Sequence, residues 1–381
     1  MFKSAKGTFY TFLIVSLTIL LFGDIMVFSA SQVTGLTTGG SSFAISWKQI
    51  LLSIAALPIA WVIAHIPLKS MKLIANIGLF LAVGIMLLLI PFGRSINGNR
   101  NWIAFGPIDL QPSEFAKLFL IIWSSLIISK NIKTPRKIFT FLMSGFAAVL
   151  AIVLAGGDLG SSVVMGLILA SILYLSGVEK IHMTLLAVLG VTGVAGLVAI
   201  QPYRIARFTA FIHPFANGIY KNAGWQPAHS LMALGTGGLF GSGLGSSMQK
   251  WGNLAEAHTD FIFAVIGEEL GLAGTIFTLV LISLLVISIF KISLSAKDDF
   301  SRFAGLGIGC WIGFQSIINL MSATSLIPVV GVTLPFISYG GSSLLALVGA
   351  LGFVAGIALR DSAVSNEINT RWPLNVARSR N

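Results

Sequence analysis

The chain contains few charged residues. Only 10% of its 381 residues are Asp, Glu, Lys or Arg, whereas soluble domains carry about 25%. Because 55% of the residues are hydrophobic, too few polar side chains remain to cover a water-soluble body of this size. The same hydrophobic content excludes intrinsic disorder, and the lack of a Gly-X-Y repeat excludes collagen. The composition therefore predicts a helical membrane protein with several spans.

Cysteine and acidic residues are also scarce. The single cysteine, Cys310, excludes an intramolecular disulfide and cysteine-rich metal sites. Lys and Arg outnumber Asp and Glu by 24 to 13, but this does not indicate nucleic-acid binding, because basic residues mark the cytoplasmic side of membrane proteins. His213, His229 and His258 match no zinc-ligand spacing, so we expect no resident metal.

Ten mostly apolar stretches are each long enough to cross a bilayer. They cover residues 8–30, 47–66, 73–91, 113–129, 138–155, 159–175, 183–200, 273–290, 303–323 and 340–359. We predict an all-α polytopic membrane protein with ten transmembrane helices in one domain, residues 1–360. The remaining residues, 361–381, are expected to form a disordered cytoplasmic tail.

The distribution of basic residues predicts the orientation. Placing both termini in the cytoplasm puts 16 of the 24 basic residues on inner segments, as the positive-inside rule requires. Two outer segments are then long, at about 92–112 and, between the seventh and eighth spans, 201–272. Connections longer than about 15 residues are usually functional or disordered. Both contain Trp, Gly, Pro and apolar residues, so function is favoured.

Ionisable side chains at membrane depth cost at least a few kcal/mol and are functional candidates. The candidates are Asp24, Glu114, Lys117, Asp158, Asp260, Glu268 and Glu269. All of them fall near the predicted outer ends of their segments, whereas a conduction pathway would place charges at mid-depth. The pattern favours chemistry or binding at the outer face.

Glu114 and Lys117 are three residues apart and share one helical face, where they can pair. They form either a structural ion pair or a cationic site for an anionic ligand. Trp102, just upstream, is either an interfacial belt residue or a stacking platform for a sugar, with Arg100 beside it to bind phosphate.

Two aspartates stand at predicted turns. Asp158 either caps the following helix or belongs to an acidic site. Asp260 is followed directly by apolar residues, and partial desolvation would raise its pKa toward the range of a general base; the alternative is a helix cap. The glycine-rich segment 235–245 is weak evidence for phosphate binding because it lacks the Lys-Ser/Thr ending of a P-loop.

Several motifs, in this order along the chain, strongly resemble the SEDS family (shape, elongation, division and sporulation). They lie at residues 28–31, 101–103, 111–117, 158–160, 256–263, 267–271 and 334–343. The segment 230–245 with Gln249-Lys250 is more similar to the division branch than to the elongation branch. The resemblance implies a peptidoglycan glycosyltransferase of the bacterial cytoplasmic membrane, which polymerises lipid II into glycan strands and releases undecaprenyl pyrophosphate.

The resemblance also implies roles for individual residues. Asp260 would be the general base on the acceptor 4-hydroxyl. The expected substrate-binding residues are Trp102, Arg100, Glu114, Lys117, Asp158, His258 and Lys250, of which Arg100 and Lys117 are assigned to the pyrophosphate or lipid carrier. Mg²⁺ assistance at the pyrophosphate is compatible with the family, although no sequence feature indicates it.

The implied partners are a class B penicillin-binding transpeptidase and divisome proteins, at the division septum. Two alternatives stay open. A lipid II flippase suits intramembrane charge and Gly/Pro-interrupted spans, and a non-catalytic scaffold would leave the chemistry to a partner.

Overall fold

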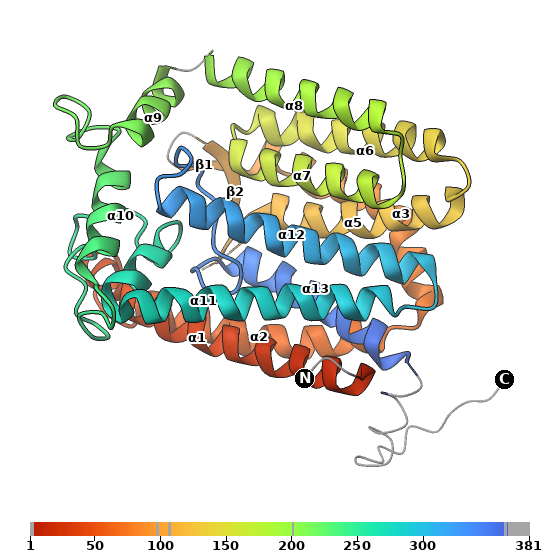
Figure 1. The fold of residues 1–381 in the computed structure, drawn as a ribbon, viewed down its shortest axis with the longest axis horizontal. Helices are drawn as coiled ribbons and strands as arrows, with labels where there is room; N and C mark the ends of the chain where they lie inside the picture. The colour runs from red at the N-terminus through yellow and green to blue at the C-terminus, as the bar shows by residue number, and fades with distance from the viewer. Residues whose placement is uncertain (1–3, 97–98, 106–107, 200–201, 362–363, 365–381) are drawn as a thin grey trace.

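The computed structural model describes residues 4–96, 99–105, 108–199, 202–361 and 364, and these form a bundle of helices (Figure 1). The helices are α1 (Ala5–Gly39), α2 (Ala44–His65), α3 (Leu68–Leu87), α4 (Leu89–Phe92), α5 (Pro112–Asn131), α6 (Pro135–Ala155), α7 (Leu159–Leu175), α8 (Lys180–Ala199), α9 (Pro202–Ile212), α10 (Trp225–Thr236), α11 (Ile262–Leu294), α12 (Asp299–Ala323) and α13 (Gly341–Leu359). Among the described residues, nine helices are long and apolar enough to cross a membrane, and α7 is a shorter apolar helix. The chain is therefore a multi-pass membrane protein, as predicted.

Each predicted span falls on one of these ten helices; that all ten cross the membrane stays a prediction. The predicted and observed helices differ most at the end of the first and at the start of the eighth. The first helix continues to Gly39, nine residues beyond the predicted end. The helix of the eighth span already begins at Ile262, and its backbone leaves the helical conformation at Gly271 (φ 66°, ψ −160°). A short helix therefore precedes the break, inside the segment that was expected to be an outer connection.

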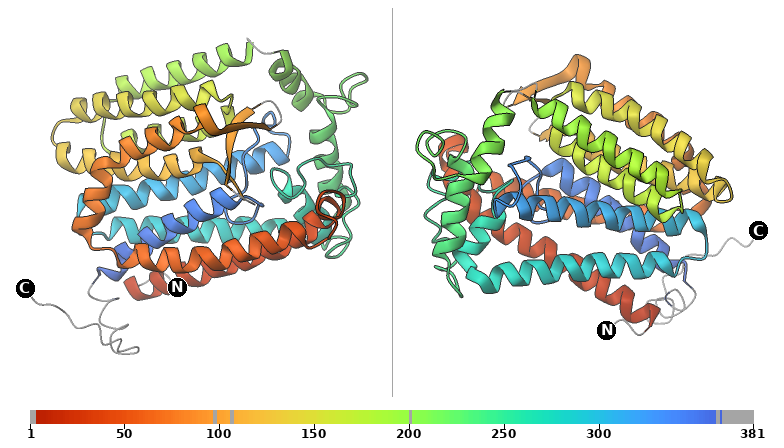
Figure 2. Two further views of the ribbon diagram at one scale, coloured as in Figure 1. Left: turned by 180° about the vertical axis from the view of Figure 1, so that it is seen from behind. Right: turned by 45° about the horizontal axis from the view of Figure 1, so that its top comes forward.

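The core of the bundle lies around α5, α12 and α13, which bury most of their residues. In the pairwise packing α12 contacts α5, α7 and α11, while α13 lies against α2 and α3 against α5. Helix α8 buries none of its residues and stands at the edge of the bundle beside α7 (Figures 1 and 2). Small residues permit close helix contacts, as at Gly352, where an added Cβ would lie 2.5 Å from the Ala60 carbonyl oxygen.

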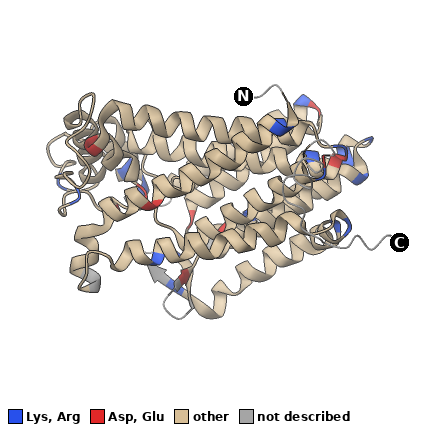
Figure 3. Cartoon of the chain, turned by 90° about the horizontal axis from the view of Figure 1, so that it is seen from below, with Lys and Arg blue, Asp and Glu red and all other residues tan. Residues whose placement is uncertain are grey.

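The first and last described residues, Ser4 and Val364, lie at one end of the bundle, which we call the termini end. A depression there is lined by Ser4 and Thr8 together with Ala358 and Asp361. Figure 3 shows Lys and Arg gathered at this end, while the middle of the helices is largely free of charge among the described residues. This distribution supports a cytoplasmic termini end, although the orientation stays a prediction. The predicted disordered tail falls almost entirely outside the described residues.

The opposite end, the loop end, comprises residues 93–110, 202–261 and 324–340. Its first part is a small antiparallel sheet of β1 (Gly93–Ile96), β2 (Asn99–Phe105) and β3 (Ile108–Leu110), in the order β1-β2-β3. Ile103 pairs with Gly93 on one side and Leu110 on the other. Aromatic and β-branched residues at 102–105 favour this conformation, so the first outer loop contains strands within an otherwise helical fold.

Candidate active site

A cavity of about 560 Å³ lies at the loop end of the bundle. Its walls come from distant parts of the chain: the sheet, the starts of α5 and α7, the end of α8, helix α9, the segment before α11 and the loop between α12 and α13. Of the sequence-predicted site residues, those that line it are Trp102, Glu114, Asp158, His258 and Asp260. The structure thus brings five of the eight candidates around one space.

The segment directly before α11 is fixed through its backbone. The Asn319 Nδ2 of α12 donates to the Asp260 carbonyl at 2.8 Å and to the Val332 carbonyl at 2.6 Å. The Ser338 hydroxyl donates to the Thr259 carbonyl at 2.5 Å, and the Tyr339 amide to the His258 carbonyl at 2.9 Å. Three successive carbonyls are therefore held by α12 and the loop that follows it, and the side chains of the same three residues line the cavity.

The Asp260 carboxyl is poised between its two protonation states. Its pKa is raised to about 7, chiefly by burial and also by the negative charges of Glu256 and Asp158, while the positive charge of Arg207 opposes the rise. A Cβ built on Gly331, which has φ +75°, would lie 3.6 Å from Asp260 Oδ2, so this loop approaches the carboxylate closely. A carboxyl with a pKa near 7 can accept a proton from a substrate at neutral pH.

His258 stands beside Asp260 in an apolar setting. Burial lowers the pKa of its imidazole, with Glu256 acting in the opposite direction, so the ring is neutral at pH 7. Its Nδ1 is buried and has no hydrogen-bond partner among the described residues, and the ring lies 5.7 Å from that of Tyr339. A neutral ring nitrogen at a cavity wall can exchange a hydrogen bond with a ligand.

Asp158 has the capping geometry that the sequence left open. Its Oδ1 accepts from the Ser161 amide at 2.9 Å at the start of α7, and its Oδ2 accepts from Gln111 Nε2 at 3.1 Å. Asp158 also lines the cavity. The same residue therefore caps α7 and contributes a carboxylate to the cavity wall. Trp102, on β2 opposite Arg94, presents a partly exposed indole to the same space.

Glu114 and Lys117 form a buried ion pair on α5, with 2.7 Å between Lys117 Nζ and Glu114 Oε1. Lys117 also donates to Gln315 Oε1 at 2.8 Å and lies 5.1 Å from the centre of the Trp311 ring. Glu114 lines the cavity, and its Oε2 has no partner within the described part of the chain. Lys117 is 1% exposed and lies behind Glu114, outside the lining.

Arg100 and Lys250 lie outside the lining too. The Arg100 guanidinium donates to the Gly93 carbonyl at 3.0 Å and the Ile90 carbonyl at 2.9 Å. Lys250 pairs with Glu269 at 2.9 Å, and both side chains are at most 1% exposed. The three cations assigned to substrate from the sequence are therefore bound to groups of the protein itself.

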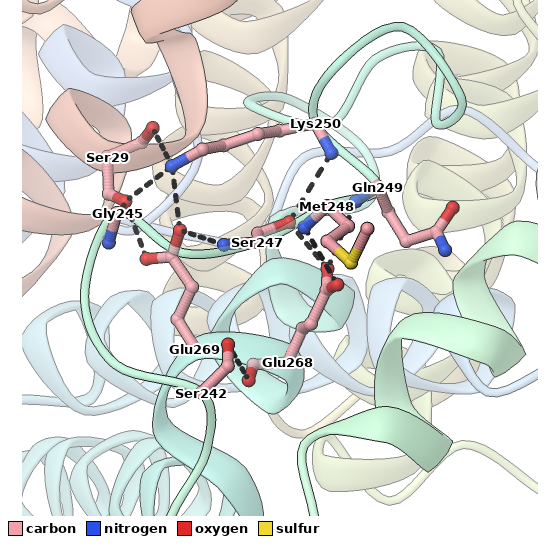
Figure 4. A network of polar contacts seen from close by, with 9 residues as sticks. All are labelled: Ser29, Ser242, Gly245, Ser247, Met248, Gln249, Lys250, Glu268 and Glu269. Atoms are coloured by element: carbon pink, nitrogen blue, oxygen red, sulfur yellow. Dashed lines mark hydrogen bonds and ion pairs between the residues drawn. The ribbon is translucent and has the colours of Figure 1, made fainter.

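Lys250 belongs to a buried polar network that joins α1, α11 and the loop before α11 (Figure 4). The Ser29 hydroxyl donates to Glu269 Oε2 at 2.5 Å, and Lys250 Nζ donates to the Ser29 carbonyl at 3.2 Å. The neighbouring Glu268 carboxylate accepts from the Ser247 hydroxyl at 2.5 Å and the Met248 amide at 2.9 Å. None of these residues lines the cavity.

The glycine-rich segment packs against the same part of α11. A Cβ at Gly237 would lie 1.8 Å from the Gly267 carbonyl oxygen, one at Gly241 2.1 Å from the Glu269 carbonyl oxygen, and one at Gly271 2.4 Å from the Gly241 nitrogen. The segment is absent from the cavity lining. Gly237 and Gly241 therefore serve main-chain packing.

The sequence analysis did not select three cations that line the cavity: Lys48, Arg204 and Arg207. A usable signal was present, because Arg204, Arg207 and Phe208 follow the i, i+3, i+4 spacing of one helical face. The described residues include no group of three or more His, Cys, Asp or Glu side chains that could hold a metal ion.

A model of the family described as cell cycle protein, FtsW/RodA/SpoVE, matches residues 9–363. The chain belongs to this family. It is the SEDS family that the motifs indicated.

Named relatives cover almost the whole chain. A probable peptidoglycan glycosyltransferase FtsW of Tolumonas auensis is 36% identical over 93% of this chain and 94% of its own length. Stage V sporulation protein E of Bacillus subtilis is 37% identical, with 91% and 94% covered. Relatives of the division and sporulation branches thus match at similar identity.

Solved structures share the fold. A chain from a peptidoglycan synthase complex, described as coordinating polymerization and crosslinking, superposes with a TM-score of 0.74 at 24% identity, covering 92% of this chain and 97% of that one. The rod shape determining protein RodA of Thermus thermophilus gives a TM-score of 0.65 at 24% identity, covering 91% and 95%.

Proposed function

We propose that this family member is a peptidoglycan glycosyltransferase that polymerises lipid II at the outer face of the cytoplasmic membrane. The observation that carries the proposal is the position of Asp260, on the wall of the loop-end cavity with a pKa of about 7. Relatives that cover most of the chain are named as probable peptidoglycan glycosyltransferases. A cavity at the loop end of a bundle of apolar helices suits a substrate that carries a lipid and a sugar.

In the proposed reaction, the 4-hydroxyl of the acceptor sugar attacks the anomeric carbon of the donor. Asp260 takes the hydroxyl proton as the new C–O bond forms, and the bond to the pyrophosphate oxygen breaks, so that undecaprenyl pyrophosphate leaves with the bonding electrons. A single displacement inverts the anomeric centre. Proton removal by a base in its working range contributes about 10²–10⁴-fold to such a step.

Other cavity residues would orient the sugars. The Trp102 indole offers an apolar face on which a sugar ring can stack, and the buried His258 ring and Glu114 Oε2 offer hydrogen-bonding atoms that the protein leaves unused among its described residues. Unsatisfied buried polar atoms are costly. Sugar hydroxyls in the cavity would remove that cost, which supports a carbohydrate ligand.

The proposed partner is a class B penicillin-binding transpeptidase, with divisome proteins at the septum. One supporting observation is the fold shared with a chain of a complex that coordinates polymerization and crosslinking. Similarity to FtsW proteins supports the division role. The alternative function, lipid II transport, predicts movement of lipid II across liposomes without polymer formation.

The test is polymerisation of lipid II by the purified protein together with its co-expressed transpeptidase. We expect glycan strands with the wild type and a loss of about 10²–10⁴-fold in rate with Asp260→Asn. Asp299→Asn is the matched control, because it makes the same chemical change in a surface pair with Arg302 at the other end of the bundle. A folded Asp260→Asn protein that polymerises at the wild-type rate would refute the role of the base, and transport without polymer would favour the flippase.

A further inference from the structure

Helix α9 presents a pair of arginines to the cavity. Arg204, Arg207 and Phe208 all line it, and the i, i+3, i+4 spacing places them on one face of the helix. The side chains of both arginines are only partly exposed. This face therefore forms a cationic wall of the same space that contains Asp260.

Each guanidinium is fixed to backbone. Arg204 Nη1 donates to the Leu197 carbonyl of α8 at 2.9 Å, and Arg207 Nη1 donates to the Val329 carbonyl at 3.3 Å. Val329 lies two residues before Gly331, the residue against the Asp260 carboxylate. Arg207 also acts electrostatically on Asp260, since its charge opposes the rise in the pKa of that carboxyl. The arginine wall and the proposed base thus meet across one loop.

An anion that enters this cavity meets several carboxyl groups, so cations are needed to offset the repulsion. Five carboxyl groups line the space, those of Asp109, Glu114, Asp158, Glu256 and Asp260, and the cations among the described lining residues are Lys48, Arg204 and Arg207. The cations expected to bind phosphate from the sequence, Arg100 and Lys117, are bound to protein groups outside the lining. Guanidinium groups bind phosphate oxygens with paired, charge-assisted hydrogen bonds.

We propose that Arg204 and Arg207 bind the diphosphate of the lipid-linked substrate, so that α9 is the diphosphate wall of the cavity. That the diphosphate belongs to a lipid rests on the proposed function, whereas the binding of a diphosphate by the two arginines does not. A cation pair facing the diphosphate stabilises the negative charge that builds up as the leaving group departs. Donor and acceptor both carry this group, and the wall recognises the chemistry that they share.

The test measures binding of farnesyl diphosphate and of farnesol to the full-length protein in detergent. We expect the variant Arg204→Gln/Arg207→Gln to weaken farnesyl diphosphate binding at least about tenfold and to leave farnesol binding unchanged, because only the diphosphate carries charge. Arg204→Lys/Arg207→Lys should recover part of the affinity, since Lys keeps the charge but not the paired donors. Lys221→Gln is the matched control, a cation of the loop end that does not line the cavity.

Two outcomes would overturn the inference. Unchanged diphosphate affinity in the Gln variant would exclude a role for the two arginines, and equal weakening of farnesol and farnesyl diphosphate would indicate a damaged wall rather than lost charge recognition. Failure of the proposed function is distinguishable. If the wild type forms no glycan but binds farnesyl diphosphate through the two arginines, the inference stands and the proposed reaction falls.

Discussion

Two groups of buried charge lie at the loop end of this protein, and they differ in how completely they are satisfied. In the network of Figure 4, Lys250 is paired with Glu269, and both glutamates accept hydrogen bonds from serine hydroxyls and backbone amides. In the cavity, His258 Nδ1 and Glu114 Oε2 have no partner among the described residues, and the pKa of Asp260 is raised to about 7. The first group satisfies its charges with protein partners, whereas the second leaves polar atoms of cavity-lining residues without partners among the described residues.

The difference separates structural from functional charge in a membrane protein. An ionisable residue at membrane depth is a functional candidate by default, and Glu269, the partner of Lys250, and Asp260 are both candidates on that ground. What distinguishes them is the surrounding protein: a saturated ion pair stabilises the fold, while an incompletely satisfied carboxyl beside a cavity can react. Five predictions test this distinction.

The largest effect is expected in the saturated network. Lys250→Met leaves the Glu269 carboxylate buried without its cation, which typically costs about 3–5 kcal/mol, so the thermal midpoint of the purified protein should fall steeply. Lys250→Met/Glu269→Gln removes both charges and should recover part of the loss. Lys72→Met is the control, because it breaks a pair of 3.6 Å with Asp298 that is 40% and 29% exposed and should cost less than about 1 kcal/mol. A Lys250→Met protein that is stable but inactive would instead show that Lys250 has a functional role.

The next effect concerns the amide that holds Asp260 in place. Asn319→Leu removes the hydrogen bonds to the Asp260 and Val332 carbonyls. Small displacements of a reacting group can cost about 10²-fold, so we expect a fall of about 10- to 100-fold in the polymerisation rate. Ser316→Ala, which removes a bond to the Ile312 carbonyl within α12, should leave the rate near the wild-type value. Equal rates for the two variants would show that the hydrogen bonds of Asn319 do not position Asp260.

The pH profile should show the ionisation of Asp260. With a pKa of about 7, the fraction of ionised carboxylate rises about tenfold from pH 6 to pH 8, and the rate should rise with it. Glu256→Gln removes a negative neighbour that raises this pKa, so its profile should move to lower pH. A profile that does not move, measured on lipid II at saturating concentration, would contradict the assignment.

The same pKa shift has a consequence for stability. Since folding raises the pKa of Asp260 from 3.8 to about 7, the native state holds the proton more tightly than the unfolded state, and the ionised carboxylate destabilises the fold as the pH rises through this window. Asp260→Asn removes that cost. The variant's thermal midpoint should therefore exceed the wild-type value at pH 8 and approach it at pH 4.

The smallest effect separates backbone strain from proximity to the base. Gly331 and Gly40 both have positive φ, +75° and +68°, but a Cβ meets the Asp260 carboxylate only at Gly331 and open space at Gly40. Alanine at either position should cost about 1–2 kcal/mol in stability, and only Gly331→Ala should also slow polymerisation, by a few fold. Similar rates in both variants would show that the loop tolerates a methyl group beside the carboxylate.

Much of the fold could be predicted from hydropathy, because each span is a local property of the sequence. The stretch 159–175 coincides with α7, and 340–359 differs from α13 by one residue. The predicted span begins only at residue 273, because Glu268 and Glu269 lower the hydropathy of the residues before it, whereas α11 begins at Ile262. In the structure those charges are compensated by Lys250, Ser29 and backbone amides, partners that hydropathy cannot show.

The site was predictable where a motif carries it and unpredictable where distant segments meet. Asp260 and Trp102 stand in recognisable motifs, and both line the cavity. Lys117 has a partner 198 residues along the chain in Gln315, and Lys250 has one 221 residues away in Ser29. The spacing of Glu114 and Lys117 showed that these two can pair, but a single sequence cannot show the distant partners of Lys117 and Lys250.

The contacts among Gly237, Gly241 and the bend at Gly271 are made by main-chain atoms on both sides. A clash between side chains can be repaired by shrinking the neighbour, but here no neighbouring side chain exists to be shortened. A second substitution at the contacting residue therefore cannot relieve the clash that a side chain at one of these positions would make. The close approach of the main chain thus requires glycine at all three positions.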